Sequence, residues 1–311
     1  MSKPNEYLVG SVIGQGSFAH VLYARHKATQ REVAIKVVEQ ITLKRRQDVM
    51  KMVLTERKIL HDLNSPFVVS LLASFYDSEC VYLVMDLASA GDFYSFIKLG
   101  LRKENEERWR SSIPYYSNQI IQAIEYIHSK EIIHCDLKPQ NILCEKHGTL
   151  KLADFGSCLT NSGMTPSMIV PRGTSEYSSP ELIKAENNLS VAVDLWSLGC
   201  ILYAMFRGDS PFHGESEALS VKLVMEYKNT QSRPLLNTGD DDFSGQWKTL
   251  IVGLLDANQP HHRIQVWEEI LTLAKEWGKP DDLLLPEAPW RKDVESSEMR
   301  DGALGWAAFE I

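Results

Sequence analysis

The chain has 311 residues, of which 44% are hydrophobic and 24% are charged, and its formal net charge is −8. These values are ordinary for a globular protein of one large or two smaller domains, and they exclude a disordered or fibrous chain. The negative charge argues against a DNA-binding surface as the main activity, so we expect no nucleic-acid partner. The local basic run from Lys44 to Arg46 is interpreted as a solvated helix face.

The sequence shows neither a long apolar run nor a secretory leader. No apolar run reaches the length of about 18 residues that a transmembrane helix needs, and the N-terminus lacks the basic start and apolar middle of a signal peptide. We therefore expect no transmembrane segment and a location in the cytosol or the nucleus. The cysteines form no CxxC pair and no His-rich cluster, which favours reduced thiols over a disulfide framework or a structural zinc site.

The N-terminal part predicts antiparallel strands joined by a glycine-rich turn. From Tyr7 the pattern LVGSVIGQGSFAHVLYARH alternates apolar residues around glycines, and REVAIKVV alternates again. Gly14 and Gly16 have no side chain, so the backbone there can approach a phosphate closely. Phe18, at the tip of the turn, would shield such a phosphate from water. The alternative for Phe18 is a solvent-exposed turn aromatic.

The following segments predict a helix, two strands and further helices. Residues Ile41 to Leu63 carry apolar residues near helical spacing, and Pro66 ends that helix. FVVSLLASFYDS and CVYLVMDLA then predict two strands, and the chain turns helical from Phe93 onward. The polar stretch Arg102 to Ser112 is interpreted as a surface loop that precedes a long helix near Tyr115 to Ser129.

The central stretch IIHCDLKPQNIL carries the chemistry, together with the triplet DFG that follows at 154–156. Asp136 is a carboxylate that can accept a hydroxyl proton, and Lys138 is a cation two residues later. Asn141 and Asp154 supply an amide oxygen and a second carboxylate. This set suits a hard divalent ion such as Mg²⁺ holding a polyphosphate while an acceptor hydroxyl is positioned for attack. The alternative is an ordinary polar loop between two buried strands.

On these motifs the chain resembles the protein kinase family, whose catalytic loop has the form HRDLxxxN and is followed by DFG. The resemblance covers roughly Tyr7 to Ala274. It implies an α+β, bilobal fold with a small β-rich N-lobe that has one main helix and a larger, mainly helical C-lobe. The implied divisions are an N-lobe at 7–87, a C-lobe at 88–275 and a C-terminal tail at 276–311 that docks back on the kinase domain.

The resemblance also implies roles for the central residues. Asp136 would be the catalytic base and Lys138 would lie near the transferred phosphate, while Asn141 and Asp154 would hold Mg²⁺. Lys36, in the segment VAIK, would bind the phosphates of ATP. Glu56 would pair with Lys36 and hold its ammonium group in place; the alternative is a solvated helix glutamate.

The implied ATP pocket combines the glycine-rich turn with the hinge that follows the strand CVYLVMD. In it, Met85 would stand at the back, Asp86 and Ala88 on the hinge, and Asp92 near the ribose. The apolar walls are equally well explained as core residues. The nucleotide-binding residues that the resemblance implies are Ile13, Gly14, Gly16, Val21, Ala34, Lys36, Met85, Asp86, Ala88, Asp92, Leu143 and Asp154.

Several positions depart from the family pattern. Ala19 replaces the third glycine, Ser179 replaces an alanine, and Cys135 replaces the arginine of HRD. In many kinases that arginine receives an activation-loop phosphate, and a cysteine makes no charged bidentate contact. We therefore hypothesise activity without phosphorylation of the loop at 157–170, in which Ser162, Thr165 and Ser167 are the candidate phosphate acceptors. For Cys135 itself, a buried packing residue and a redox switch are the two alternatives.

Other motifs fit the same resemblance. Asp194 would brace the backbone of the catalytic loop, and Arg263 would pair with Glu181. Trp306 and Phe309, three residues apart near the C-terminus, would dock on the small lobe; the alternatives are a terminal helix packed on the large lobe and an exposed peptide awaiting a partner.

The sequence therefore predicts an ATP- and Mg²⁺-dependent protein kinase whose partner is a protein substrate. Lys138 and Thr174 favour serine or threonine over tyrosine acceptors within the resemblance. The phrases SLLASFYDSECVYLVMDLASAGDF and GTSEYSSPEL are most similar to the AGC group, especially the phosphoinositide-dependent kinases. The alternative is a pseudokinase that acts as a nucleotide-binding scaffold. A small-molecule kinase is disfavoured by the peptide-platform segment Gly173 to Glu181.

Overall fold

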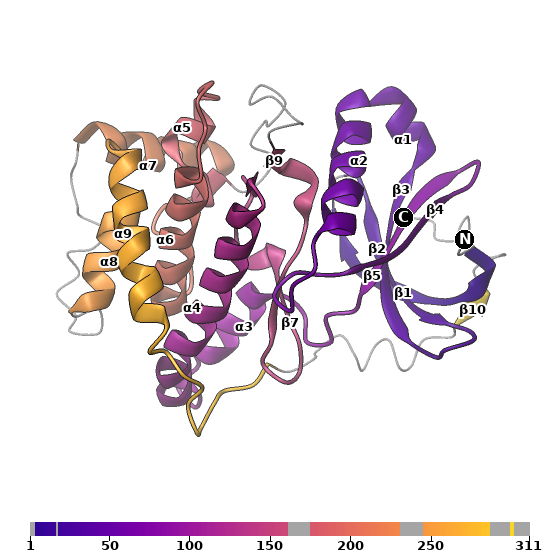
Figure 1. Ribbon diagram of the computed structural model, residues 1–311, viewed down its shortest axis with the longest axis horizontal. Helices are drawn as coiled ribbons and strands as arrows, with labels where there is room; N and C mark the ends of the chain where they lie inside the picture. The colour runs from indigo at the N-terminus through magenta and orange to yellow at the C-terminus, as the bar shows by residue number, and fades with distance from the viewer. Residues whose placement is uncertain (1–3, 17, 161–174, 231–244, 287–298, 302–311) are drawn as a thin grey trace.

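The computed structural model describes residues 4–16, 18–160, 175–230, 245–286 and 299–301. They form a small lobe built around one sheet and a larger lobe built mainly of helices (Figure 1). The two-lobed α+β fold predicted from the sequence is therefore confirmed.

The small lobe is a sheet of antiparallel strands in the order β10-β1-β2-β3-β5-β4. Strand β10, from the far end of the chain, pairs with β1 at Leu8 and Val9. Beyond Val9, the pairing of β1 with β2 shifts register twice, between Val9 and Val12 and between Val12 and Gly14. The strands are β1 (Tyr7–Gln15), β2 (His20–His26), β3 (Glu32–Glu39), β4 (Leu71–Tyr76), β5 (Cys80–Asp86) and β10 (Arg300–Asp301).

The single helix predicted from Ile41 to Leu63 is two helices, α1 (Gln40–Arg45) and α2 (Gln47–Asp62). The backbone of Arg46 leaves the helical region, with φ −128° and ψ 86°. In one straight helix, Leu43 and Val49 would lie about 120° apart around the axis. The break instead lets both residues pack with Val38 of β3 in one buried cluster.

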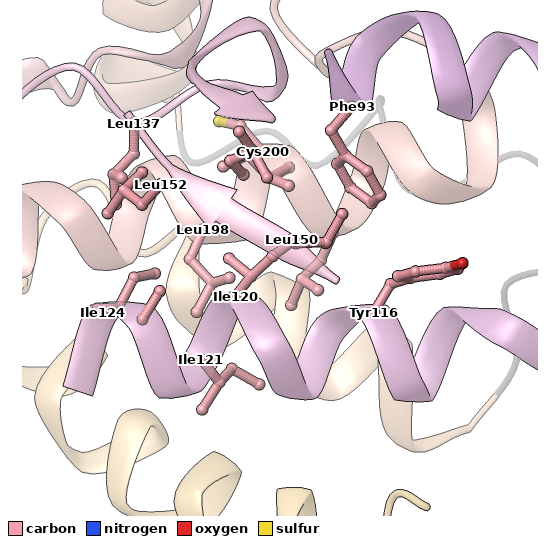
Figure 2. Close-up of a cluster of buried hydrophobic side chains, with 14 of the residues drawn as sticks. Phe93, Tyr116, Ile120, Ile121, Ile124, Leu137, Leu150, Leu152, Leu198 and Cys200 are labelled. Carbon is pink, nitrogen blue, oxygen red and sulfur yellow. The ribbon is translucent and has the colours of Figure 1, made fainter. Parts of the chain in front are cut away.

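The larger lobe encloses the main core. Figure 2 shows how Ile120 and Ile124 of α4 lie near Leu150 and Leu152 of β8, with Leu198 of α6 in the same cluster. The helices are α3 (Phe93–Gly100), α4 (Glu106–Ser129), α5 (Pro180–Ile183), α6 (Ala192–Arg207), α7 (Glu217–Thr230), α8 (Gln246–Leu254) and α9 (Pro260–Ala274). Two short antiparallel pairs complete it, β6 (Ile132–Ile133) with β9 (Leu159–Thr160) and β7 (Ile142–Cys144) with β8 (Leu150–Leu152).

The surface loop predicted at Arg102 to Ser112 is wrong in its second half, because α4 already begins at Glu106. Trp109 is fully buried, packs edge-on against Phe96 with ring centroids 5.2 Å apart, and donates its indole N–H to the Met205 carbonyl over 2.8 Å. A Cβ at Gly100 would clash with the Trp109 ring. The polar composition of Arg102 to Ser112 gave no sign that Trp109 is buried, because its partners lie in α3 and α6.

The chain continues to pack on the large lobe after α9. Trp277 stacks on Trp247 with ring centroids 4.7 Å apart, and Leu283 and Leu284 are buried. The Leu284 N–H donates to Ser112 Oγ of α4 over 3.0 Å. Within the described residues, no helix is both long enough and apolar enough to cross a membrane.

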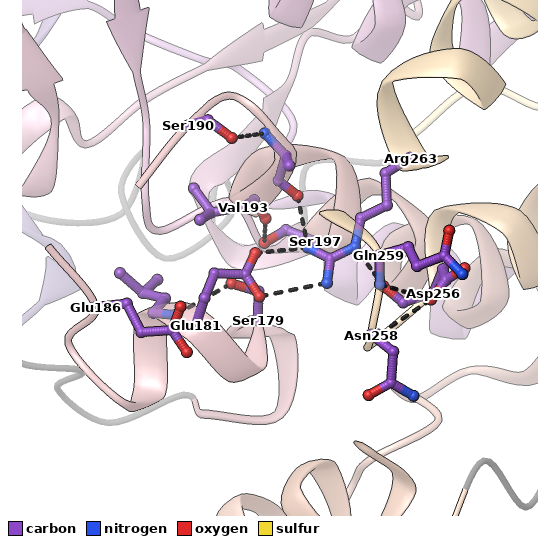
Figure 3. Close-up of polar contacts among 12 residues, drawn as sticks. Ser179, Glu181, Glu186, Ser190, Val193, Ser197, Asp256, Asn258, Gln259 and Arg263 are labelled. Carbon is purple, nitrogen blue, oxygen red and sulfur yellow. Dashed lines mark hydrogen bonds and ion pairs between the residues drawn. The ribbon is translucent and has the colours of Figure 1, made fainter. Parts of the chain in front are cut away.

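A buried ion pair ties α5 to α9. Arg263 Nη1 lies 2.6 Å from Glu181 Oε1, as Figure 3 shows, so the predicted pair is confirmed. Arg263 is fully buried, and it also donates to the carbonyls of Asp256 and Ala192 over 2.8 and 2.9 Å. These bonds fix the helix α5, which directly follows the segment at 175–179, against the core of the large lobe.

We expect Arg263→Leu to destabilise the protein strongly, because the Glu181 carboxylate would stay buried without a cation. Breaking a buried pair from one side costs about 3–5 kcal/mol in unfolding free energy, which urea denaturation measures. The matched control is Lys222→Leu, which removes the exposed pair with Glu226 at 3.6 Å. That loss should stay below about 1 kcal/mol. Equal losses in the two variants would contradict the prediction.

Candidate active site

A cleft with a volume of about 660 Å³ is lined by residues of both lobes. Every catalytic, nucleotide-binding and metal-binding residue predicted from the sequence lines it. From the small lobe come Ile13, Gly14, Gly16, Val21, Ala34, Lys36 and Glu56, and from the hinge and the large lobe come Met85, Asp86, Ala88, Asp92, Asp136, Lys138, Asn141, Leu143 and Asp154. Residues far apart in the sequence are thus brought to one cavity.

The glycine-rich turn between β1 and β2 forms one wall of the cleft. Phe18 lines the cleft and packs against the cluster that α1 and α2 form on the sheet. The Arg46 guanidinium lies 4.9 Å from the centre of its ring. The alternative of a solvent-exposed aromatic at Phe18 is therefore wrong.

Lys36 of β3 joins two carboxylates from different parts of the chain. Its ammonium nitrogen lies 2.7 Å from Glu56 Oε2 of α2 and 3.1 Å from Asp154 Oδ1. Burial would lower the pKa of Lys36, but the charges of Asp154 and Glu56 outweigh burial and raise the pKa above its ordinary value. Lys36 is therefore a fixed positive charge beside the cleft, and the predicted pair with Glu56 is present.

Asp136, Lys138 and Asn141 form a second polar group on the opposite side. Lys138 Nζ lies 3.0 Å from both carboxylate oxygens of Asp136, and Asn141 Nδ2 donates to Asp136 Oδ2 over 2.9 Å. Burial raises the pKa of Asp136, and Lys138 opposes that rise. The carboxylate is thus held in one orientation by two donors and has the higher basicity that suits a proton acceptor.

The backbone beside Asp136 is strained and is held by Asp194. Cys135 has φ +63°, in the left-handed region that non-glycine residues seldom adopt. The buried Asp194 carboxylate accepts the N–H groups of His134 and Cys135 over 2.8 and 2.9 Å, and His128 Nε2 lies 2.8 Å away. Burial would raise the pKa of Asp194, but these hydrogen bonds lower it below its ordinary value. The brace predicted from the sequence is present.

Cys135 itself lies in an apolar cluster. Its side chain packs with Leu159, Leu182 and Val193, and burial raises the pKa of its thiol well above the ordinary value. A neutral, buried thiol is a poor nucleophile, because the thiolate is the reactive form. Of the two alternatives for Cys135, the structure therefore favours packing over a redox switch.

Asn141 and Asp154 fit a hard divalent ion. Since the Nδ2 of Asn141 donates to the main chain and side chain of Asp136, its Oδ1 is the atom that can act as a metal ligand. The Asp154 side chain is 47% exposed, lines the cleft and has φ +62°. The charge of Lys36 holds the pKa of Asp154 below its ordinary value, so the carboxylate is ionised. An amide oxygen and a carboxylate are ligands that Mg²⁺ accepts.

The hinge end of the cleft is fixed by backbone hydrogen bonds. Ala90 N–H donates to the Cys144 carbonyl over 2.9 Å, and Cys144 N–H donates to Gly91 over 2.8 Å. Asp92 caps α3 by accepting from the Ser95 N–H over 2.9 Å. Asp92, which was predicted to lie near the ribose, thus also fixes the start of α3.

Sequence reasoning missed some of the cleft residues. Met52 of α2 lines the cleft one helical turn before Glu56, and the spacing of four residues was the signal that could have found it. Val69 lines it as well, from the segment before β4. Gln140 was passed over although it lies between Lys138 and Asn141.

Some predictions fall on residues outside the described ranges. They are the phosphate acceptors Ser162, Thr165 and Ser167, the start of the segment 173–181, and the terminal pair Trp306 and Phe309.

Comparison with known proteins gives one family and several relatives. The family described as "Protein kinase domain" matches residues 7–274. "Rho-associated protein kinase 1" of Homo sapiens is 35% identical over 258 residues, which are 81% of this chain and 18% of that protein. "Putative 3-phosphoinositide-dependent protein kinase 2" of Homo sapiens is 35% identical over 230 residues, which are 72% of this chain and 55% of that protein.

A further relative, "3-phosphoinositide-dependent protein kinase 1" of Rattus norvegicus, is 35% identical over 230 residues, or 72% of this chain and 39% of that protein. The matched part of the chain thus spans between 18% and 55% of these relatives' own lengths. The similarity to AGC-group kinases that the sequence motifs indicated agrees with these relatives.

We expect Asp194→Asn to lose about 1–3 kcal/mol of unfolding free energy in urea denaturation, because an amide leaves at least one buried donor without an acceptor. The difference in unfolding free energy between Asp194→Asn and wild type should be largest at neutral pH. It should shrink below pH of about 4, because a carboxylate with a lowered folded-state pKa loses its stabilising effect as it is protonated. The control is the exposed Asp62→Asn, expected to stay within about 0.5 kcal/mol. A pH-independent difference would contradict this account of Asp194.

Proposed function

Because this chain belongs to the protein kinase family, we propose that it transfers the γ-phosphate of ATP to serine or threonine hydroxyls of protein substrates. The observation that carries the proposal is the convergence of two polar groups on one cleft. Lys36, fixed by Glu56 at 2.7 Å, lies on one side, and Asp136, held by Lys138 at 3.0 Å, lies on the other. One group suits phosphates and the other suits an acceptor hydroxyl.

Lys36 and Glu56 act as a positioning pair. Two hydrogen bonds from Lys36 to Glu56 restrict the rotation of the lysine side chain. The positive charge is therefore already positioned where the phosphates of ATP would bind. The backbone of Gly14 and Gly16 would contact the same phosphates from the small-lobe side of the cleft. Because Glu56 holds the ammonium group through both carboxylate oxygens, Lys36 needs little reorganisation to meet the phosphates of ATP.

Asp136 accepts the proton of the substrate hydroxyl. The donor contact from Asn141 fixes the orientation of its carboxylate, and Lys138 lies where it can neutralise charge on the phosphoryl group being transferred. Burial raises the pKa of Asp136, which strengthens it as a base while Lys138 keeps it ionised.

Asn141 and Asp154 are the residues that would hold the divalent metal that the family uses, and we propose that this metal is Mg²⁺. When bound, such an ion neutralises charge on the phosphate oxygens. The remaining contribution of this chain is to keep Asp154 ionised through Lys36, which lies 3.1 Å from it.

The lobe divisions at 7–87 and 88–275, with a tail from 276, form part of the same proposal. The burial of Leu283 and Leu284 against the large lobe supports a tail that docks back on the domain. The proposed ATP pocket extends to the hinge, with Met85 at its back and with Asp86 and Ala88 on the hinge.

The alternative function is a pseudokinase that binds nucleotide and serves as a scaffold. The replacements at Ala19, Cys135 and Ser179 favour this alternative. Against it stands the complete set of paired polar side chains, because a chain released from catalysis has no need of a buried lysine held by two carboxylates.

We expect Asp154→Ala to abolish transfer of ³²P from ATP and Mg²⁺ to mixed serine, threonine and tyrosine peptides. Loss of a direct metal ligand should lower kcat by more than about 100-fold. Wild type should label serine or threonine peptides. The matched control is Asp62→Ala, at an exposed aspartate that does not line the cleft, which should keep wild-type activity. No transfer by wild type that still binds ATP would favour the scaffold.

We further propose that the enzyme is active without phosphorylation of its activation loop. Where many kinases have an arginine that pairs with a loop phosphate, this chain has Cys135 in an apolar cluster with Leu182 and Val193. A phosphate placed there would find no cation at that position.

Phosphatase treatment should accordingly leave kcat within about two-fold of the untreated value, since no charged contact at residue 135 is lost. The measurement is the peptide assay before and after treatment, with mass spectrometry to verify that phosphate is removed. The triple variant Ser162→Ala, Thr165→Ala and Ser167→Ala should behave in the same way. A large loss of activity in both cases would overturn the proposal.

A further inference from the structure

The carboxylate of Asp86 bonds to a cation from each lobe. Arg31 Nη2 lies 2.7 Å from Asp86 Oδ1, and Lys151 Nζ lies 3.1 Å from Asp86 Oδ2. Arg31 directly precedes β3 of the small lobe, whereas Lys151 lies in β8 of the large lobe. Asp86 is the last residue of β5, at the point where the chain leaves the small lobe.

The two bonds differ in what they connect. Asp86 is paired with Val33 in the sheet, so its main chain moves with the small lobe and with Arg31. Lys151 is paired with Leu143 of β7 and moves with the large lobe. The contact between Asp86 and Arg31 is therefore internal to one lobe. The contact between Asp86 and Lys151 crosses the hinge, next to the backbone bond from Val69 N–H to the Leu152 carbonyl at 3.0 Å.

The contact across the hinge is also the better shielded of the two. The side chains of Asp86 and Lys151 are only 14% and 13% exposed, whereas Arg31 is 56% exposed. Burial would raise the pKa of Asp86, but the hydrogen bond and charge of Lys151 lower it below its ordinary value. The carboxylate is thus ionised at neutral pH, and little water separates or screens the pair.

Lys151 acts at a distance from any ligand. Asp86 is among the described residues that line the cleft, and Lys151 is not. A change at Lys151 therefore reaches a bound nucleotide through the placement of the lobes rather than through direct contact. Opening of the lobes about the hinge would separate Lys151 from Asp86. Each charge would then keep only the partner in its own lobe, Glu145 at 3.4 Å for Lys151 and Arg31 at 2.7 Å for Asp86.

We propose that the ion pair between Asp86 and Lys151 is a clasp that holds the lobes closed and sets how long a nucleotide stays in the cleft. This inference rests on the proposed function, in which the cleft binds ATP and releases ADP. Lys151 is then a positioning residue, and the release of ADP is the step that it slows.

The test is the dissociation rate of a fluorescent N-methylanthraniloyl ADP, measured by displacement with excess ATP in stopped flow. Lys151→Met should speed dissociation by about 3- to 10-fold, because a partly buried pair that exists only in the closed form is lost. Lys151→Arg should restore the wild-type rate. The matched control is Arg31→Met, which also removes one cation from Asp86 but breaks no contact between the lobes, and its rate should stay within about two-fold of wild type.

Salt gives a second readout on the same samples. Raising the NaCl concentration should speed dissociation from wild type more than from Lys151→Met, since only wild type has the pair to screen. If Lys151→Met fails to fold, Lys151→Gln removes the same charge, keeps a polar side chain and is compared with Arg31→Met. Equal rates in wild type and Lys151→Met, or an equal increase in Arg31→Met, would overturn the clasp.

Hydrogen exchange of the hinge amides at 87–91, without nucleotide, separates this inference from the proposed function. Faster exchange in Lys151→Met than in Arg31→Met supports the clasp even if wild type fails to bind the ADP analogue, a result that would count against the nucleotide site alone. Equal exchange in the two variants, with or without nucleotide binding, counts against the clasp.

Discussion

The ammonium group of Lys36 lies between the carboxylates of Glu56 and Asp154, at 2.7 and 3.1 Å, and the shape of the cleft depends on this contact. Lys36 and Glu56 are largely buried, and an unpaired charge in such a place costs several kcal/mol, so these two residues require each other. The strand β3, the helix α2 and the segment that follows β8 are therefore fixed relative to one another. Because one of the three belongs to the large lobe, the contact also orients the two lobes.

Two strained backbone positions lie on the large-lobe side of the same cleft. Cys135 and Asp154 both have left-handed backbone conformations, with φ of +63° and +62°. Such conformations cost of order 1–3 kcal/mol each and persist only where the surroundings impose them. At Cys135 the imposing group is Asp194, and at Asp154 it is the attraction of Lys36. The fold thus tolerates a loss of stability at positions that set the orientation of the Asp136 and Asp154 carboxylates.

The sequence predicted the cleft well because its residues carry their chemistry in short motifs. Asp136, Lys138 and Asn141 are recognisable within six positions, and the turn with Gly14 is equally local. Two features that the sequence analysis missed depend on partners distant along the chain. Trp109 is buried by residues of α3 and α6, and the carboxylate of Asp86 finds partners 55 residues before it and 65 after it. No local pattern marks such contacts.

The short strand β10 also bears on how the molecule behaves at high concentration. An edge strand presents unpaired N–H and C=O groups that can template aggregation with a second molecule. Here β10 covers the β1 edge at Leu8 and Val9, and the register shifts of β1 begin directly after Val9. Because β10 has only two residues and the pairing of β1 becomes irregular after Val9, a second molecule finds little straight backbone with which to pair. The return of the chain to its first strand therefore protects this edge of the sheet against edge-to-edge association, whereas β4 forms the opposite edge.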